Sequence, residues 1–310
     1  MRQQIPAHHS PSSNIDQCTA ATYASDTLCQ YTGSHLSYTS SSHTFKNDDF
    51  KDCSSSNDNG GAIKCTGSNT ALIVKGCAFS GCSVRNVNSY CGGAIYAQSI
   101  QSVTTQLSVF TSCSAEWGGG LFINDIQRTP DLSECVFSSC KGYDHAAGAF
   151  VGRCTKTTSF VACSDSLFIA CTNVPGSTFL YGGGFYLDIY ANTHANTVSN
   201  VLFTKNSVNG QGAGVNIYES EIDLVYSLRF CFFSRNHASD NGHDISMYNI
   251  KMISFLHCLT TSDASNRVYL SLPIYETASS RTTTHTPNWL PEGNCHSSLG
   301  NRETVKITYP

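Results

Sequence analysis

One short phrase recurs seven times in this chain and constrains its fold more than any other feature. It consists of a phenylalanine, a cysteine or asparagine three residues later, and then a pair of small residues, mostly glycines, that opens a short apolar run. Successive phenylalanines lie 29, 31, 27, 31, 35 and 30 residues apart. A period of this size predicts a solenoid with one coil per repeat. The two columns are Phe50, Phe79, Phe110, Phe137, Phe168, Phe203 and Phe233, and Cys53, Cys82, Cys113, Cys140, Cys171, Asn206 and Asn236.

Each repeat contains the patterns of short strands. After the glycine pair, apolar or small residues recur at spacing two, as in Ile95 and Ala97, which predicts a strand with one buried face. The segment that ends at the phenylalanine, such as 71–79, predicts a second strand, with the phenylalanine and the residue two before it facing inward. No helical periodicity is present. We therefore expect an all-β chain that forms a single right-handed parallel β-helix of about seven to eight coils, since parallel crossovers are right-handed.

The repeat also divides the chain. We expect the β-helix to span residues 35–276, with an incomplete or mobile N-terminal cap at 1–34 and a Ser/Thr/Pro-containing tail at 277–310. The first fifteen residues have no apolar core, so no secretory signal is expected, and no apolar run approaches the ~20 residues of a membrane helix. These features leave three readings open: a cytosolic protein, an unconventional route of export, or a fragment of a longer chain.

Eight of the 16 cysteines fall into two columns. Asn206 and Asn236 replace cysteine in the column after the phenylalanine, and Ser108 and Ser166 replace it in a second column two residues before the phenylalanine. Parallel side chains on coils about 4.8 Å apart would hold their Cβ atoms farther apart than the usual ~3.8 Å of a disulfide. Buried free thiols are therefore favoured over disulfides, and stacked asparagines are expected to hydrogen-bond from coil to coil.

The doubled phrase, Phe-x-x-(Asn/Cys) with Gly-Gly-Ala-(Ile/Leu/Val), resembles the repeats of chlamydial polymorphic outer-membrane proteins. It resembles even more closely the Cys-rich right-handed β-helix surface proteins of trichomonad protozoa. The resemblance covers about residues 45–260. It implies a cell-surface or extracellular β-helix with an adhesin-like role and brings no catalytic residues. The chain departs from these families in lacking a signal peptide, a C-terminal translocating barrel and a transmembrane helix.

Composition and charge exclude several function classes. Only 13% of the residues are charged, the net charge is −4, and the 18 lysines and arginines are scattered, so we expect no nucleic-acid partner. A β-helix lyase stacks several aspartates around Ca²⁺ and a hydrolase pairs two carboxylates. Here the acids fall in different columns, the closest approach being Asp125, Asp188 and Glu219, and the segment 237–244 contains two histidines and two aspartates in a bend. We expect no catalytic residue, metal or cofactor.

Two outward columns are candidate binding surfaces. The first lies between the two inward positions of the glycine strand, and its exposed apolar part would be Tyr96, Phe122, Val151 and Tyr186. An aligned aromatic stripe suits a sugar or peptide partner, unless an insertion such as 172–180 or 188–200 folds over it. The second is the column just before the phenylalanine, and its apolar residues are expected to be covered or shared with another chain: Ala78, Val109, Val136, Leu167, Leu202 and Phe232.

The sequence thus predicts a non-enzymatic surface adhesin-like or structural interaction module, with a host-surface glycan or protein as its partner. One alternative is a carbohydrate-active β-helix enzyme, a pectate-lyase-like lyase or a hydrolase. The other is a decayed or fragmentary copy without an independent function, which the worn seventh repeat favours.

Overall fold

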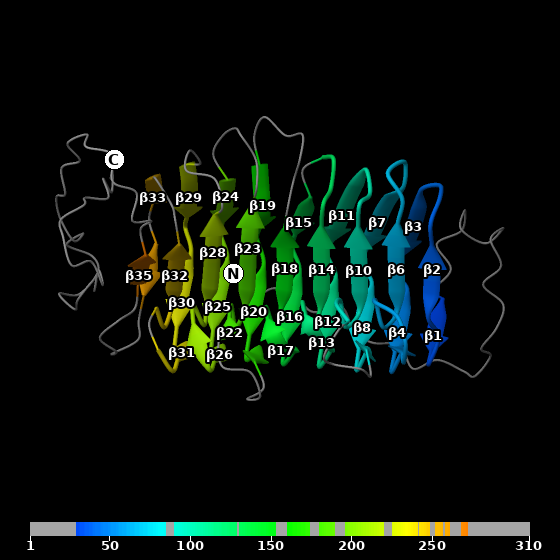
Figure 1. Ribbon diagram of the computed structural model, residues 1–310, viewed down its shortest axis with the longest axis horizontal. Helices are drawn as coiled ribbons and strands as arrows, with labels where there is room; N and C mark the ends of the chain where they lie inside the picture. The colour runs from blue at the N-terminus through cyan, green and yellow to red at the C-terminus, as the bar shows by residue number, and fades with distance from the viewer. Residues whose placement is uncertain are drawn as a thin grey trace.

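The described residues form a right-handed parallel β-helix. The computed structural model describes residues 29–271, except 85–89, 129, 153–159, 174–179, 190–195, 220–224, 241, 249–251, 257 and 261–267. Its strands stack in four parallel sheets along one axis, and the coils advance from the blue to the orange end in a right-handed sense (Figure 1). Within this part of the chain every element is a β-strand. The predicted fold class is confirmed.

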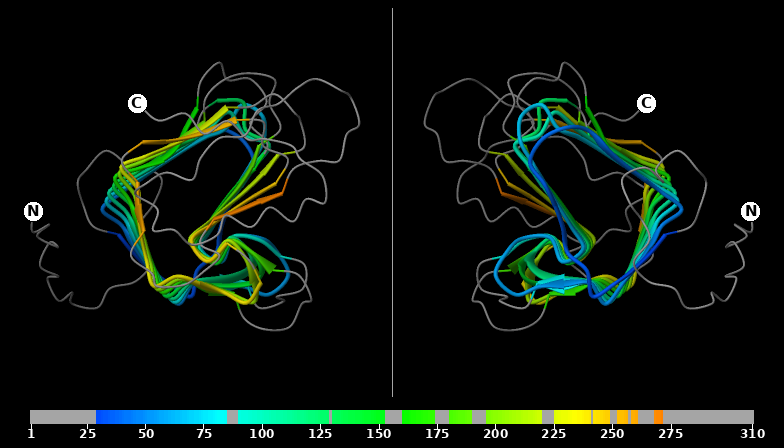
Figure 2. Two further views of the ribbon diagram at one scale, coloured as in Figure 1. Left: turned by 90° about the vertical axis from the view of Figure 1, so that its left-hand side faces the viewer. Right: turned by 90° about the vertical axis from the view of Figure 1, so that its right-hand side faces the viewer.

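Three sheets enclose the main core, and the fourth forms a smaller lobe beside them (Figure 2). Sheet A carries the phenylalanines: β1 (Gln30–Thr32), β4 (Asp49–Lys51), β8 (Ala78–Ser80), β12 (Val109–Thr111), β16 (Val136–Ser138), β20 (Leu167–Ile169), β25 (Leu202–Thr204), β30 (Phe232–Ser234) and β34 (Leu259–Thr260). Sheet B follows the glycine pairs: β2 (Leu36–Tyr38), β6 (Ile63–Thr66), β10 (Ile95–Gln98), β14 (Leu121–Asn124), β18 (Ala149–Gly152), β23 (Phe185–Ile189), β28 (Val215–Glu219), β32 (Ile245–Tyr248) and β35 (Val268–Ser271).

Sheets C and D complete each coil. Sheet C precedes sheet A in the chain: β3 (His43–Lys46), β7 (Ala71–Lys75), β11 (Ser102–Gln106), β15 (Asp131–Ser133), β19 (Phe160–Ser164), β24 (Asn196–Ser199), β29 (Val225–Arg229) and β33 (Met252–Leu256). Sheet D lies between A and B: β5 (Ser54–Ser55), β9 (Ser83–Val84), β13 (Ser114–Trp117), β17 (Lys141–His145), β21 (Thr172–Asn173), β26 (Ser207–Val208) and β31 (His237–Ala238), with β22 (Leu180–Tyr181) and β27 (Gly210–Gln211) beside it.

The predicted strand that ends at the phenylalanine is in fact two strands in different sheets. In the second coil β7 ends at Lys75, Gly76 takes a φ of 68°, and β8 begins two residues later. Other coils place Asn47, Leu107, Glu134, Asp165, Asn200 or Phe230 at this corner with φ between 50° and 57°. A left-handed residue turns the chain sharply, so the prediction of one continuous strand is wrong.

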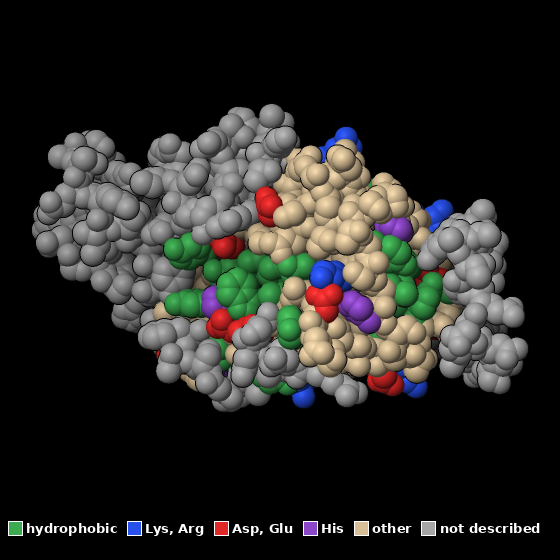
Figure 3. All heavy atoms as spheres, turned by 45° about the vertical axis from the view of Figure 1, so that its right-hand side comes forward, with side chains coloured by type: hydrophobic (Ala, Val, Ile, Leu, Met, Phe, Trp, Pro, Cys, Tyr) green, Lys and Arg blue, Asp and Glu red, His purple; other side chains and the backbone are tan. Residues whose placement is uncertain are grey.

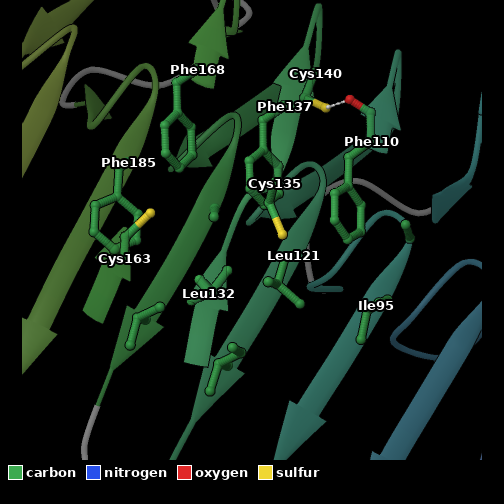
Figure 4. Close-up of a cluster of buried hydrophobic side chains, with 14 of the residues drawn as sticks. Ile95, Phe110, Leu121, Leu132, Cys135, Phe137, Cys140, Cys163, Phe168 and Phe185 are labelled. Carbon is green, nitrogen blue, oxygen red and sulfur yellow. Dashed lines mark hydrogen bonds between the residues drawn. The ribbon is translucent and has the colours of Figure 1, made fainter. Parts of the chain in front are cut away.

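Stacked phenylalanine rings form the centre of the core. Phe110, Phe137 and Phe168 are fully buried, and their ring centroids lie 4.6 and 4.7 Å apart with nearly parallel planes (Figure 4). The same stacking runs through the whole predicted column, and Tyr31 extends it by one ring at the N-terminal end. Offset-stacked aromatic pairs contribute about 0.5–1.5 kcal/mol each beyond their buried area. The predicted phenylalanine ladder is confirmed.

The cysteine column exchanges with asparagine because both side chains donate a hydrogen bond to the equivalent carbonyl, that of the phenylalanine one coil earlier. The Cys140 thiol donates to the Phe110 carbonyl at 3.5 Å (Figure 4), and Asn206 Nδ2 donates to the Phe168 carbonyl at 3.0 Å. Asn206 Nδ2 also donates to Asn236 Oδ1 at 3.1 Å, the predicted coil-to-coil bond. The thiols of both columns in the described residues are free; Cys29, outside the columns, is disulfide-bonded.

Replacing Asn206 tests this explanation. Asn206→Ala removes the side-chain donor to the Phe168 carbonyl and the buried acceptor of the Cys171 amide, which donates to Asn206 Oδ1 at 3.0 Å, so we expect a loss of about 3 kcal/mol in the free energy of unfolding. Asn206→Cys keeps a donor for the carbonyl and should lose about half as much. Urea denaturation measures both, and equal losses would contradict the shared role.

Strands of the β-helix lie near both ends of the described residues. Sheet A begins at Gln30, inside the segment predicted as a cap, because β1 pairs with β4. The last described strand, β35, pairs with β32 in sheet B. The predicted tail at 277–310 lies outside the described residues.

Candidate functional site

The aromatic stripe predicted on sheet B exists, but one member is wrong. Strand register aligns Tyr96, Phe122, Phe150 and Tyr186, whereas Val151 aligns with Ile123 and lies in the main core. The fourth coil is shifted by one residue because its left-handed corner is Ala146, with a φ of 55°, where other coils have a glycine. The predicted small-residue pair therefore starts one position too late in this coil.

The stripe is not an exposed binding surface. Tyr96, Phe122, Phe150 and Tyr186 are only 7%, 4%, 2% and 6% exposed. Their rings stack on one another at 5.1, 4.8 and 5.3 Å and form a second hydrophobic cluster outside the main core. We call these four residues the aromatic cluster. The expectation of exposure is wrong, because the chain between the cysteine column and the glycine pair folds back over sheet B.

The cover consists of side chains from strands of the sheet D lobe. Trp117 of β13 lies 5.4 Å from the Phe150 ring, and His145 of β17 lies 5.2 Å from the Tyr186 ring. Tyr181 of β22 packs against the same cluster. Of the two insertions named from the sequence, residues 174–179 and 190–195 lie outside the described residues.

Trp117 is held in a defined orientation on this face. Its ring stacks on His145 at 4.6 Å with planes 8° apart, and its Nε1 donates to Asp144 Oδ2 at 3.0 Å. The other carboxylate oxygen, Oδ1, lies 2.8 Å from His145 Nδ1, and the two side chains are 27% and 18% exposed. Figure 3 shows hydrophobic side chains gathered on a face of the rod, with histidine and acidic groups beside them. Trp117 is thus a half-buried aromatic side chain held in a defined orientation.

A second carboxylate lies beside Asp144. Trp117 pairs with His145 across β13 and β17, so Glu116 and Asp144, which precede them, occupy neighbouring strands. Burial raises the pKa of Glu116, and the charge of Asp144 raises it further, while His145 acts in the opposite direction. Sequence reasoning missed this pair. Each acid stands two residues before the left-handed corner of its coil, and this shared spacing could have identified the pair. The corner of the fourth coil was assigned one residue too late, so the two acids did not align.

The carboxylates singled out in the sequence do not stack. Asp188 pairs with Tyr218, and Glu219 pairs with Ile189, so the two acids occupy different positions of the register. Asp125 lies at a left-handed corner after β14 and accepts a hydrogen bond from Ser99. In the bend at 237–244, His243 Nδ1 accepts the amide of Ala238. Within the described residues no group of three or more His, Cys, Asp or Glu side chains could hold a metal ion.

The second predicted column leaves an open groove on the outer face of sheet A. Val136, Leu167, Leu202 and Phe232 are half-buried, and they form one wall of a concavity of about 580 Å³. The opposite wall consists of the left-handed corner residues Glu134, Asp165, Asn200 and Phe230, and the floor consists of Cys135, Ser166 and Val201. This groove is the second candidate surface of the molecule.

Comparison with known families and proteins adds no assignment. No helix long and apolar enough to cross a bilayer occurs among the described residues. No protein-family profile, no curated protein and no solved structure matches the chain.

Proposed function

We propose that this chain is a non-enzymatic, adhesin-like β-helix that binds glycans through the face around Trp117. The observation that carries the proposal is the half-buried Trp117 ring, which is fixed by its stack on His145 and its hydrogen bond to Asp144. A cell-surface location is part of the proposal and rests on the resemblance of the repeats.

The chemistry of this face suits a sugar. A half-buried aromatic ring can offer an apolar surface to the C–H groups of a pyranose. Carboxylates such as Glu116 and Asp144 accept hydrogen bonds from hydroxyl groups, and charged acceptors make the stronger bonds. Because the aromatic cluster beneath is packed and stacked, the site is preformed and loses little conformational entropy on binding.

A carbohydrate-active enzyme is the second candidate, and the pair Glu116 and Asp144 favours it. A glycosidase requires two carboxyl groups, one of which stays protonated as the general acid, and the raised pKa of Glu116 fits that role. It ranks second because Asp144 is already engaged by Trp117 and His145, which leaves it poorly placed to attack a substrate.

A glycan array tests the proposal with the full chain beside two variants. Trp117→Leu keeps the cover apolar but removes the ring and its N–H, and should weaken binding by about tenfold or more. Ile73→Ser, a substitution of a surface residue on sheet C that is 37% exposed, is the matched control and should bind like the parent. The thermal midpoints of both variants are measured in parallel.

Three other outcomes would contradict the proposal. Equal binding by the Trp117→Leu variant would show that the glycan site does not lie on this face. New reducing ends or unsaturated products from bound glycans, lost in Asp144→Asn, would favour the enzyme. A folded chain that binds no glycan would leave a structural scaffold or a copy without a function of its own.

A further inference from the structure

We propose that the groove on the outer face of sheet A is a second, separate binding site, which holds an extended protein segment of alternating basic and apolar residues. The groove spans four successive coils, from β16 to β30, along the rod axis. With a rise of about 4.8 Å per coil, it accommodates roughly four to five extended residues.

The two walls of the groove differ in chemistry. One is apolar, because Val136, Leu167, Leu202 and Phe232 lie in register on the outward side of sheet A. The other carries Glu134 and Asp165 on neighbouring coils, both exposed. Side chains of an extended strand alternate between two sides, so a strand in this groove would direct every second residue toward the acids and the others toward the apolar wall.

The charge of the acidic wall is not balanced within the described protein. Asp165 accepts a hydrogen bond from Asn200 at 2.6 Å, which leaves its charge in place, and neither Asp165 nor Glu134 takes part in an ion pair among the described residues. Like charges on adjacent strands repel each other. A lysine or arginine between them would relieve this repulsion, so charge complementarity selects a basic segment.

Two bulky residues occupy left-handed corners in the same column as the two acids. Leu107 and Phe230 hold left-handed conformations, with φ of 52° and 53°, and are 48% and 55% exposed. Bulky side chains adopt this conformation at a cost of about 1–2 kcal/mol, whereas glycine and asparagine do so readily. An exposed side chain at such a corner adds little to the core. Phe230 borders the groove, where it can contact a bound apolar or cationic side chain.

Fluorescence polarisation with a labelled peptide of alternating Lys and Leu tests the proposal. A peptide with the same lysines and leucines in two blocks, and one of alternating Glu and Leu, are the comparison probes. We expect the alternating Lys–Leu peptide to bind best. Phe230→Asn and Asp165→Asn should each weaken its binding by about tenfold, while the Asp240→Asn variant, which removes a carboxylate outside the groove, should bind as the parent does.

The variants distinguish a loss of peptide binding from a loss of folding and from an effect on the glycan face. Asparagine suits a left-handed corner, so Phe230→Asn should not lower the thermal midpoint. Trp117→Leu should leave peptide binding unchanged. Equal binding of the three peptides, unchanged binding in Phe230→Asn, or self-association of the chain that Phe230→Asn abolishes would each overturn the proposal.

Discussion

Raising the pH from 8 to 11 under reducing conditions is expected to unfold the rod, with a midpoint at about pH 10. The cause is the row of buried thiols. Burial raises the pKa of Cys65 to about 11 and those of Cys77, Cys91 and Cys163 to about 12. Burial also raises the pKa values of Cys113, Cys135 and Cys171 in the core.

The direction follows from proton linkage. A thiol whose pKa is higher in the folded protein than in the unfolded chain contributes its full stabilisation below the unfolded pKa, about 8.5. Above that pH the thiols ionise in the unfolded chain but not in the folded protein. Each thiol therefore lowers the free energy of unfolding by about 1.4 kcal/mol per pH unit until its folded pKa is reached. Several thiols together remove on the order of 10 kcal/mol, comparable to the whole stability of a domain.

Urea denaturation at pH 7 to 10.5, with thiolate absorbance as a second probe, measures this effect. The double variant Cys113→Ser/Cys171→Ser is the control, because a serine hydroxyl can donate to the same carbonyls and does not ionise in this range. The slope of its free energy of unfolding against pH should be roughly a quarter smaller than that of the parent. A urea midpoint that stays constant from pH 8 to 10.5 would refute the prediction.

The repeat columns carried most of the information about the fold. Phe137 and Cys140 recur with a fixed offset because each must fill the same position in a stacked core, and stacking repeats the position in every coil. The glycine pair also predicts a feature of the fold, the corner before sheet B. Gly92 has a φ of 73°, and a Cβ on Gly93 would meet the next coil, so both positions exclude larger residues in this coil.

The corners between sheets C and A could not be read from the sequence. Gly76 or Asn200 would indicate a turn, but Leu107 and Phe230 adopt the same left-handed conformation and carry no such signal. The conformation there is imposed by the strands on both sides and by neighbouring coils. A predicted single strand therefore became two, and the number of sheets rose to four.

The candidate site was harder to predict because it depends on the lobe of sheet D. Its strands vary in length and sequence from coil to coil, and several of them are only two residues long. Trp117 and His145 occupy the same position before the left-handed corner, but the residue type at this position changes from coil to coil, so the sequence shows no column there. Outward apolar residues on sheet B are expected both on a covered face and on a binding face, so the sequence pattern does not distinguish the two. In the structure the lobe packs on these residues and covers them.

The close approach of successive coils makes Gly93→Ala the substitution with the largest expected effect on stability. A Cβ on Gly93 would lie 2.6 Å from the Ser114 amide nitrogen and would also meet the Gly119 carbonyl oxygen. Both are backbone groups of the next coil, which the parallel ladders hold in place, so relief requires the coils to separate. We expect a loss of about 3–5 kcal/mol in the free energy of unfolding, measured by urea denaturation.

Gly33→Ala is the matched control, since it adds the same methyl group in open space. Gly33 has a φ of 65° and no atom within 4 Å of a built Cβ, so only the backbone conformation is penalised, by about 1 kcal/mol. Ala147 and Ala213 occupy the position of Gly93 in their own coils, which shows that the crowding is set locally by the facing strand. If the two variants lose equal stability, the close packing of coils is not what selects glycine at position 93.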